Sequence, residues 1–259
     1  MSDTFHIVIP SRYSSSRLPG KPLKLIAGKT MIARVYEQAV KSGIKSICVA
    51  TDDARIQAEV ESFAGQVVMT RADHQSGTDR LAEVCELQGW DDNDIVINLQ
   101  GDEPLMPPEV IQFLAEIAKQ TDAAISTLAT PITTIEDVFN PNIVKVVMDA
   151  KGKAHYFSRA PIPWDRDNYT WTPADTCPPA DVKTQRFRHL GMYAYRVSTL
   201  KKIPQLPPCE VEQIESLEQL RPLHNGIEIQ VGIIDNAPDH GIDTEEDLLR
   251  VNALFTEST

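Results

Sequence analysis

Short apolar runs alternate with helical patterns along the first half of this chain, and that alternation constrains the fold most. The run from Phe5 to Pro10 is mostly apolar and ends at a proline, which is typical of a parallel strand buried on both faces. A polar loop follows it. Apolar residues then recur at helical spacing over 31–40 until Gly43, before a second apolar run at 46–50. Strand, loop, helix and strand in this order predict a βαβ unit.

The same alternation continues further along the chain. The pattern predicts helices near 54–63, near 77–88 and after Pro107, with strands at 67–70 and 95–100 between them. Such alternation predicts an α/β fold in which a mostly parallel sheet lies between two layers of helices. In sheets of this kind ligands bind beyond the carboxyl ends of the strands, so we expect the chemistry in the loops that follow these strands.

The second half of the chain is less regular. Its strand-like runs are separated by a polar, proline-rich excursion at 163–186, which predicts an antiparallel or mixed arrangement. These runs are 125–129, 144–148, 155–157 and 192–195. The pattern then predicts one helix near 211–224, which Pro222 ends or kinks, a strand at 228–234 and a closing helix from Thr244. No linker separates two independent domains, so we expect one domain over all 259 residues.

Composition excludes several classes of protein. The net charge of −12 argues against nonspecific binding to nucleic acid or to an anionic membrane. The chain has no apolar run of about 18 residues and no secretory pattern at its start, so we expect no membrane insertion and a cytoplasmic location. The four cysteines form no C-x-x-C pair and the six histidines have no metal-ligand spacing. Reduced thiols are expected, with Cys48 and Cys85 in the core.

The strongest local feature is the loop from Ser11 to Pro22, directly after the first strand. It carries two arginines and one lysine, namely Arg12, Arg17 and Lys21, together with four serines and a glycine. Cations, hydroxyls and free amide groups in a loop between a strand and a helix suit a polyphosphate. The loop is not a Walker P-loop, because Pro22 stands where that motif has a hydroxyl residue. The alternative is a solvated basic loop.

Two acidic residues are candidate metal ligands. Asp102 ends an apolar strand within Gln100–Pro104, so it should lie at the carboxyl edge of the sheet, where it suits Mg²⁺ bound jointly with phosphates. A turn-forming role is the rival explanation, and the basic loop is what favours the metal. Asp243 could be the second carboxylate, or an ordinary residue ahead of the loose capping box of Thr244 and Asp247.

Three further segments carry weaker signals. Ser76 or Thr78 can cap the helix near 77–88, or the segment can recognise a base. Arg159, His189 and Tyr193 lie at strand ends and offer the mixture of groups that a sugar acid needs, although a lone histidine is more often structural. The glutamates of the helix near 211–224 have the spacing of a solvated face.

Taken together, these segments resemble the 3-deoxy-manno-octulosonate cytidylyltransferase (CMP-Kdo synthetase) family. The match runs in order from about residue 5 to 254. The motifs that carry it are the loop from Pro10 to Leu23, Ala50-Thr51-Asp52-Asp53, Ser76-Gly77-Thr78, Gln100-Gly101-Asp102-Glu103-Pro104, Val144-Lys145-Val146-Val147, Tyr156-Phe157-Ser158-Arg159-Ala160, His189-Leu190-Gly191, Leu217-Glu218-Gln219-Leu220-Arg221 and Gly241-Ile242-Asp243-Thr244.

The resemblance implies a Rossmann-like nucleotidyltransferase that works on CTP and an eight-carbon sugar acid, with Mg²⁺, as a homodimer. Residues of about 1–125 and 225–259 would form the nucleotide-binding core, and about 126–224 the smaller sugar-binding and dimerisation portion. The residues that would meet the nucleotide are Arg12, Arg17, Lys21, Ser76, Gly77, Arg80 and Gln100. Those that would meet the sugar are Gln100, Arg159, His189, Tyr193, Glu218 and Gln219. Asp102 and Asp243 would hold the metal, and with Arg12 and Lys21 they would be the catalytic set.

Three rival functions remain. The nearest is the same reaction on another acid sugar, such as 8-amino-3,8-dideoxy-octulosonate or a nonulosonate. A nucleotide-dependent regulatory protein without turnover is disfavoured, because both acidic candidates and all three basic loop residues are present. A dinucleotide oxidoreductase is disfavoured because no G-x-G-x-x-G follows the first strand.

Overall fold

Strand β1 (Phe5–Pro10) is buried on both faces, and Ile7, Val8 and Ile9 have no exposed surface. It pairs in parallel with β4 (Ser46–Thr51) on one side and with β6 (Ile95–Asn98) on the other. Helices must therefore cover both faces of this sheet, as the apolar run predicted. The coordinates are those of a computed structural model that describes residues 4–15, 17–74, 76–169, 185–238 and 241–257.

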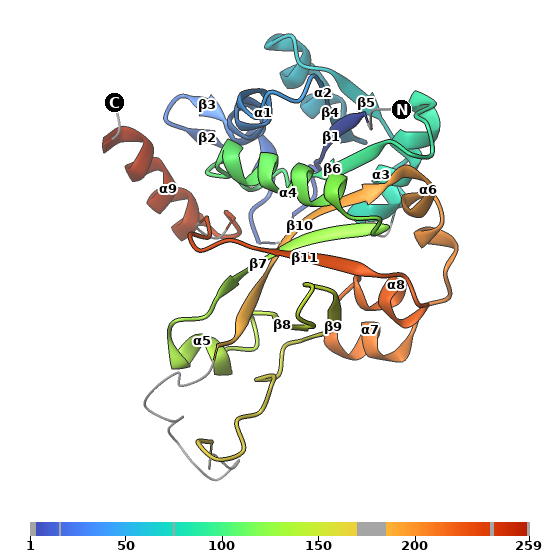
Figure 1. Cartoon of the computed structure of the whole chain (residues 1–259). Coiled ribbons are helices and arrows are strands. Elements are labelled where there is room, and N and C mark those ends of the chain that lie inside the picture. Colours follow the sequence, from blue (N-terminus) through green and yellow to red (C-terminus); the bar gives the residue numbers. More distant parts are fainter. Residues whose placement is uncertain (1–3, 16, 75, 170–184, 239–240, 258–259) are drawn as a thin grey trace. The chain divides into compact units, whose positions relative to one another are not determined.

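The chain divides into two compact units (Figure 1). Unit 1 comprises Met1–Lys119, Met192–Pro204 and Pro238–Thr259. Unit 2 comprises Gln120–Gly191 and Gln205–Ala237. The division differs from the expected portion at about 126–224 in three places: 120–125 and 225–237 belong to unit 2, and 192–204 belong to unit 1. Strand pairing explains the two larger differences. Residues 193–196 pair with β6 in unit 1, and residues 229–233 pair with residues 125–129 in unit 2.

Unit 1 holds a mostly parallel sheet. Strand β5 (Val67–Met69) extends it in parallel beyond β4, and the second half of β10 (Phe187–Arg196) pairs antiparallel with β6. The helices of this unit are α1 (Met31–Lys41), α2 (Ala54–Ser62), α3 (Gly77–Gln88), α4 (Pro108–Gln120), α6 (Val197–Leu200) and α9 (Glu245–Glu257), with short 3₁₀ turns η1 (Lys21–Leu23) and η2 (Ile203–Gln205). A small hairpin joins β2 (Leu25–Ile26) to β3 (Lys29–Thr30). The expected three-layer α/β fold is confirmed.

Unit 2 is mixed, as expected. Strand β11 (Ile229–Ile233) pairs in parallel with β7 (Ile125–Pro131), which neighbours β10. Strand β8 (Lys145–Met148) pairs antiparallel with β9 (Ala154–Ser158) and with the start of β10. Its helices are α5 (Ile135–Phe139), α7 (Glu210–Glu215) and α8 (Leu220–His224).

The prediction of one helix near 211–224 is wrong. The segment forms α7 and α8, and the break comes at Ser216, whose φ of 52° is left-handed and cannot continue a helix. Pro222 neither ends nor kinks the segment. It lies in the first turn of α8, where a missing backbone N–H costs nothing.

Other expectations can be compared directly with the described residues. Cys48 and Cys85 are buried free thiols, as predicted, and burial raises the pKa of each to about 12. Most of the proline-rich excursion, 170–184, lies outside the described residues. In the part of the chain that the structure describes, no helix has both the length and the apolar character needed to cross a membrane.

Candidate functional site

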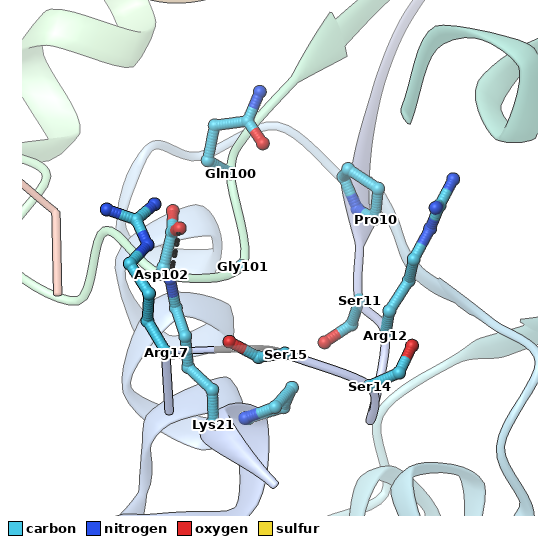
Figure 2. Close-up of a pocket in the computed structure, with 11 residues that line it drawn as sticks. Pro10, Ser11, Arg12, Ser14, Ser15, Arg17, Lys21, Gln100, Gly101 and Asp102 are labelled. Atoms are coloured by element: carbon cyan, nitrogen blue, oxygen red, sulfur yellow. Dashed lines mark hydrogen bonds and ion pairs between the residues drawn. The ribbon is translucent and has the colours of Figure 1, made fainter. Parts of the chain in front are cut away.

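A pocket of about 340 Å³ opens at the carboxyl end of β1 in unit 1. It is lined by Pro10, Ser11, Arg12, Ser14, Ser15, Arg17, Lys21, Pro22, Gln100, Gly101 and Asp102. The loop after β1 and the loop after β6 therefore meet at the edge of the sheet where ligands of parallel sheets bind. Figure 2 shows Arg12 across the pocket from Lys21 and Asp102, with Gln100 on a further side.

Lys21 lies between the two carboxylates predicted to bind a metal. Its Nζ donates to Asp102 Oδ2 at 2.6 Å and to Asp243 Oδ1 at 3.0 Å. Arg17 pairs with the other oxygen of Asp243 at 3.1 Å. Although desolvation opposes the shift, the charges of Asp102 and Asp243 raise the pKa of Lys21 above its usual value. Lys21 therefore stays a cation in this site.

Local packing explains how these three residues meet. Gly20 takes a left-handed φ of 66°, which lets the loop turn into the 3₁₀ turn η1 and brings Lys21 towards the sheet edge. Ile242 is fully buried in a cluster with Leu18 and with apolar residues of α1 and α9. Its backbone N–H donates to the Asp102 carbonyl at 2.9 Å. Asp243, the next residue, is thereby held beside Lys21.

Two polar groups in the pocket wall have no protein partner among the described residues. They are the hydroxyl of Ser11 and one terminal nitrogen of Arg12, and both atoms are buried. A buried donor without a partner is costly, so such groups mark a place where a ligand completes the bonding. Arg12 was predicted to meet the nucleotide. Ser11 is not among the predicted site residues, because the sequence alone does not distinguish it from the other serines of the loop.

Gly101 is required by a close approach of two backbones. A Cβ at this position would lie 2.8 Å from the Pro10 carbonyl oxygen and 3.3 Å from the Ser11 hydroxyl. The absence of a side chain therefore lets the loop after β6 pack against the end of β1, which brings Asp102 to the pocket.

The segment at the start of α3 has a clear structural role. Ser76 caps the helix by accepting from Asp79 N at 3.1 Å, and Asp79 accepts from Ser76 N at 3.2 Å. The predicted capping role is thus confirmed. Gly77 lies near the pocket, because a Cβ at this position would be 3.8 Å from the ring of Pro10, which lines the pocket. Arg80 is fully buried, bonds Thr70 and pairs with Asp52 at 3.4 Å. Desolvation by burial is the main cause of its lowered pKa.

Glu103 was not predicted as a site residue. Its Oε2 is buried without a partner among the described residues. Burial, together with the neighbouring charge of Asp102, raises the pKa of Glu103 to about 8, so the carboxyl is largely protonated at neutral pH. The sequence did contain a signal that could have identified Glu103 as a site residue, because it is a second carboxylate directly after Asp102 at the end of a buried strand.

The residues predicted to meet the sugar belong to both units. Gln100 and Tyr193 are in unit 1, where Tyr193 is 8% exposed and stacks on Tyr195 with ring centroids 5.5 Å apart. Arg159, His189, Glu218 and Gln219 are in unit 2. Glu218 and Gln219 lie in the turn between α7 and α8 and not on one long helix, so the predicted acidic helix face does not exist there.

His189 is held as a neutral imidazole. Its Nε2 lies 3.0 Å from Thr127 Oγ1, and its ring meets the Phe157 ring edge-on with centroids 5.0 Å apart. Burial lowers the pKa of His189 to about 3. A neutral ring offers one donor and one acceptor, which suits hydroxyl groups better than a carboxylate.

Comparisons with known proteins agree with these features. Residues 6–229 match the model of the cytidylyltransferase family. The chain is 53% identical over 253 residues to 3-deoxy-manno-octulosonate cytidylyltransferase of Cellvibrio japonicus, covering 97% of this chain and 98% of that one. It is 52% identical to the Hahella chejuensis protein of the same name, covering 98% and 99%. A solved structure of CMP:2-keto-3-deoxy-manno-octonic acid synthetase complexed with CTP superposes with a TM-score of 0.89 at 41% identity, covering 99% and 100%.

The close approach at Gly101 predicts the effect of a single methyl group. Gly101→Ala should lower the free energy of unfolding by about 1–3 kcal/mol, because the backbone of Pro10 must move. Gly77→Ala is the matched control, since its Cβ would meet only the Pro10 ring at 3.8 Å, and its effect should stay within about 0.5 kcal/mol. Urea denaturation of the two variants measures the difference. Equal stabilities would contradict the packing described for this loop.

The lowered pKa of His189 predicts a loss of stability in acid. The unfolded chain, in which histidine has a pKa of about 6.5, takes up the proton first. The contribution of neutral His189 to the free energy of unfolding is therefore complete above pH 6.5 and falls as the pH drops towards about 3. Up to about 2 kcal/mol is lost between pH 7 and pH 5. His189→Gln should remove this part of the pH dependence, whereas His224→Gln, exposed on α8, should not. Thermal unfolding at pH 7 and pH 5 measures this difference. An equal change in Tm for native protein and for His189→Gln would contradict the lowered pKa of His189.

Proposed function

The chain belongs to the cytidylyltransferase family, and from this premise we propose that it transfers CMP from CTP to 3-deoxy-D-manno-octulosonate (Kdo), giving CMP-Kdo and pyrophosphate. The observation that carries this is the pocket at the end of β1, where Arg12, Arg17 and Lys21 gather beside Asp102. In a protein with a net charge of −12, such a cluster of cations marks the place of an anionic substrate.

The reaction needs an attack on phosphorus in line with the leaving group. The anomeric C2 hydroxyl of Kdo attacks the α-phosphorus of CTP, a new phosphorus–oxygen bond forms, and the bond to the β-phosphate breaks to release pyrophosphate. The hydroxyl proton passes to solvent, and none of the described residues is assigned as a general base. Catalysis therefore depends on positioning and on stabilising negative charge.

The basic loop supplies that stabilisation. Arg12 has a buried terminal nitrogen with no partner among the described residues, so it can donate to a phosphate oxygen without first breaking a protein bond. Lys21 and Arg17 must exchange carboxylate partners for phosphate oxygens. This exchange costs little, because one charge-assisted bond replaces another.

The donor set also suits Mg²⁺. Asp102 Oδ2 and Asp243 Oδ1 lie within 3.0 Å of one nitrogen, so the two carboxylates already face a common point where a cation is favourable. Asp102 and Asp243 would hold the ion, with the remaining positions filled by phosphate oxygens and water. When bound, Mg²⁺ neutralises phosphate charge and lowers the pKa of an oxygen that it binds.

Kdo would be recognised by a cation together with neutral polar groups and one carboxylate. Arg159 suits the carboxylate, because a guanidinium binds it with two parallel bonds. The neutral ring of His189 suits a hydroxyl, and Tyr193, Gln100, Glu218 and Gln219 complete the proposed set. The nearest alternative substrates are 8-amino-Kdo and the nonulosonates, which a comparison of purified sugars in the same assay distinguishes from Kdo.

The cellular setting is part of the proposal. CMP-Kdo is an activated sugar for lipopolysaccharide, and its synthesis needs CTP, which points to the cytoplasm. The described cysteines are buried free thiols, in keeping with a reducing compartment. A homodimer is proposed from the family resemblance, and sedimentation analysis measures it.

Pyrophosphate release tests the function directly. The assay runs over a panel of nucleoside triphosphates and acid sugars, with and without Mg²⁺. We expect release only when CTP, Kdo and Mg²⁺ are all present. Release with 8-amino-Kdo or a nonulosonate but not with Kdo would replace the substrate, and binding of CTP without turnover on any sugar would favour a regulatory protein.

Lys21→Ala tests the role of the basic loop in catalysis. Removal of one donor to the developing charge should lower kcat by roughly 10²–10³-fold while the KM for Kdo changes much less. Lys41→Ala, at the exposed end of α1, is the charge-matched control and should leave kcat unchanged. An unchanged kcat in Lys21→Ala would refute the role.

The carboxylate pair can be tested without turnover. In native protein Lys21 already satisfies Asp102 and Asp243, so Mg²⁺ alone should raise the Tm only slightly. In Lys21→Met the two carboxylates lose that cation, and Mg²⁺ should raise the Tm more strongly. Adding Asp102→Asn to this variant should abolish the gain. Equal Mg²⁺-induced shifts in native protein and in Lys21→Met would contradict a shared cation position.

A further inference from the structure

Arg159 follows β9 in unit 2, and its guanidinium is tied to two separate segments. Its Nε donates to the Glu215 carbonyl at 2.7 Å, and one terminal nitrogen donates to the Pro141 carbonyl at 3.0 Å. The other terminal nitrogen lies 3.5 Å from the Ser216 carbonyl. Because a guanidinium has five N–H donors, one donor on each terminal nitrogen remains for a ligand.

The backbone of Arg159 is held from both sides. Its N–H donates to Glu215 Oε2 at 2.9 Å, and its carbonyl accepts from Lys145 Nζ at 2.6 Å. The other carboxylate oxygen of Glu215 accepts from the Ser158 hydroxyl at 2.5 Å. Glu215 and Lys145 thus fix the peptide groups on either side of the Arg159 Cα, which decides where the side chain starts.

Lys145 is unusual because it is a cation with no exposed surface. Its other two bonds go to the carbonyls of Asn140 and Ile143, at 3.0 and 2.7 Å, and none of the ion pairs among the described residues includes it. Burial lowers the pKa of Lys145 to about 8, partly offset by the charge of Glu215. A buried ammonium is costly, and an apolar side chain could fill the same space more cheaply.

The same network reaches the turn between α7 and α8. Glu215 ends α7, and Ser216 takes the left-handed conformation that separates the two helices. The turn then continues to Glu218 and Gln219, which the proposed function places near the sugar. The Arg159 guanidinium, bonded to the carbonyls of Glu215 and Ser216, therefore also braces this turn.

We propose that Glu215 and Lys145 are positioning residues that hold Arg159 for the carboxylate of the acid sugar. Neither needs to touch the sugar. Their effect reaches it through the backbone and side chain of Arg159, so the loss of either should weaken the binding of Kdo and spare that of CTP. The inference rests on the proposed function, in which Arg159 binds that carboxylate.

Steady-state kinetics on full-length variants separate the two substrates. Glu215→Gln keeps the shape but leaves only one oxygen in place of the two that accept from the Arg159 N–H and the Ser158 hydroxyl, and Lys145→Met removes the cation at similar volume. We expect the KM for Kdo to rise roughly tenfold or more and the KM for CTP to stay within about twofold. Glu210→Gln and Lys151→Met, both exposed in the same unit, are the matched controls and should change neither KM. Equal rises in both KM values would overturn the proposal.

A double-mutant cycle distinguishes positioning from a general structural role. If Glu215 acts through Arg159, the effect of Glu215→Gln on the KM for Kdo should disappear in an Arg159→Ala background. Independent, additive effects would refute the inference even if Lys145→Met failed to fold. Thermal unfolding of Glu215→Gln checks that its fold survives. Absence of any activity of native protein with CTP and Kdo would instead refute the proposed function, so the two failures are distinguishable.

Discussion

Strand β1 lies between β4 and β6 in parallel register, and the rest of unit 1 depends on its burial. With Ile7, Val8 and Ile9 fully enclosed, the polar loop can begin only beyond Pro10, at the carboxyl edge of the sheet. Ser11 N still donates to the Ala50 carbonyl at 2.9 Å, so the basic loop leaves the sheet in a defined direction. The loop after β6 ends at the same edge, and Gly101 lets the two backbones approach. The pocket follows from these constraints.

The cations of the pocket are already paired with carboxylates of the chain. Cations in the basic loop are paired with Asp102 and Asp243 before any substrate is present. These pairs reduce the repulsion between like charges in the loop, and in the proposed function they are exchanged for pairs with a phosphate or a metal. Arg12 differs, because one of its nitrogens lacks a partner among the described residues and so contributes a donor that is ready for a ligand.

The environments of Lys21 and Lys145 have opposite effects on the pKa of the two lysines. Lys21 faces carboxylates, which raise its pKa, and it can leave them for another anion. Lys145 is buried, has a lowered pKa and donates to three backbone carbonyls, one of them that of Arg159, which follows β9. The difference is one of environment and not of residue type. In the proposals made above, Lys21 binds the substrate and Lys145 positions another residue.

Much of the fold could be predicted because helical and strand periodicities are local. The strands at Phe5–Pro10, Ser46–Thr51 and Ile95–Asn98 and the helix Gly77–Gln88 agree closely with the patterns, and their order places the loop of Arg12 and the loop of Asp102 at one edge. The break at Ser216 was missed, because a left-handed serine has no distinct local signal and the apolar spacing continues across it.

The sequence by itself therefore determined the layered fold, the basic loop and the acidic residues at strand ends, since each depends on neighbours a few positions away. Only the tertiary structure decided that Lys21 contacts both Asp102 and Asp243, although Asp243 lies 222 positions from Lys21 in the chain. It also decided that Arg80 is buried and that Lys145 brackets Arg159. Such contacts depend on how Ile242 and its apolar neighbours pack, and packing between distant segments leaves no periodic trace in the sequence.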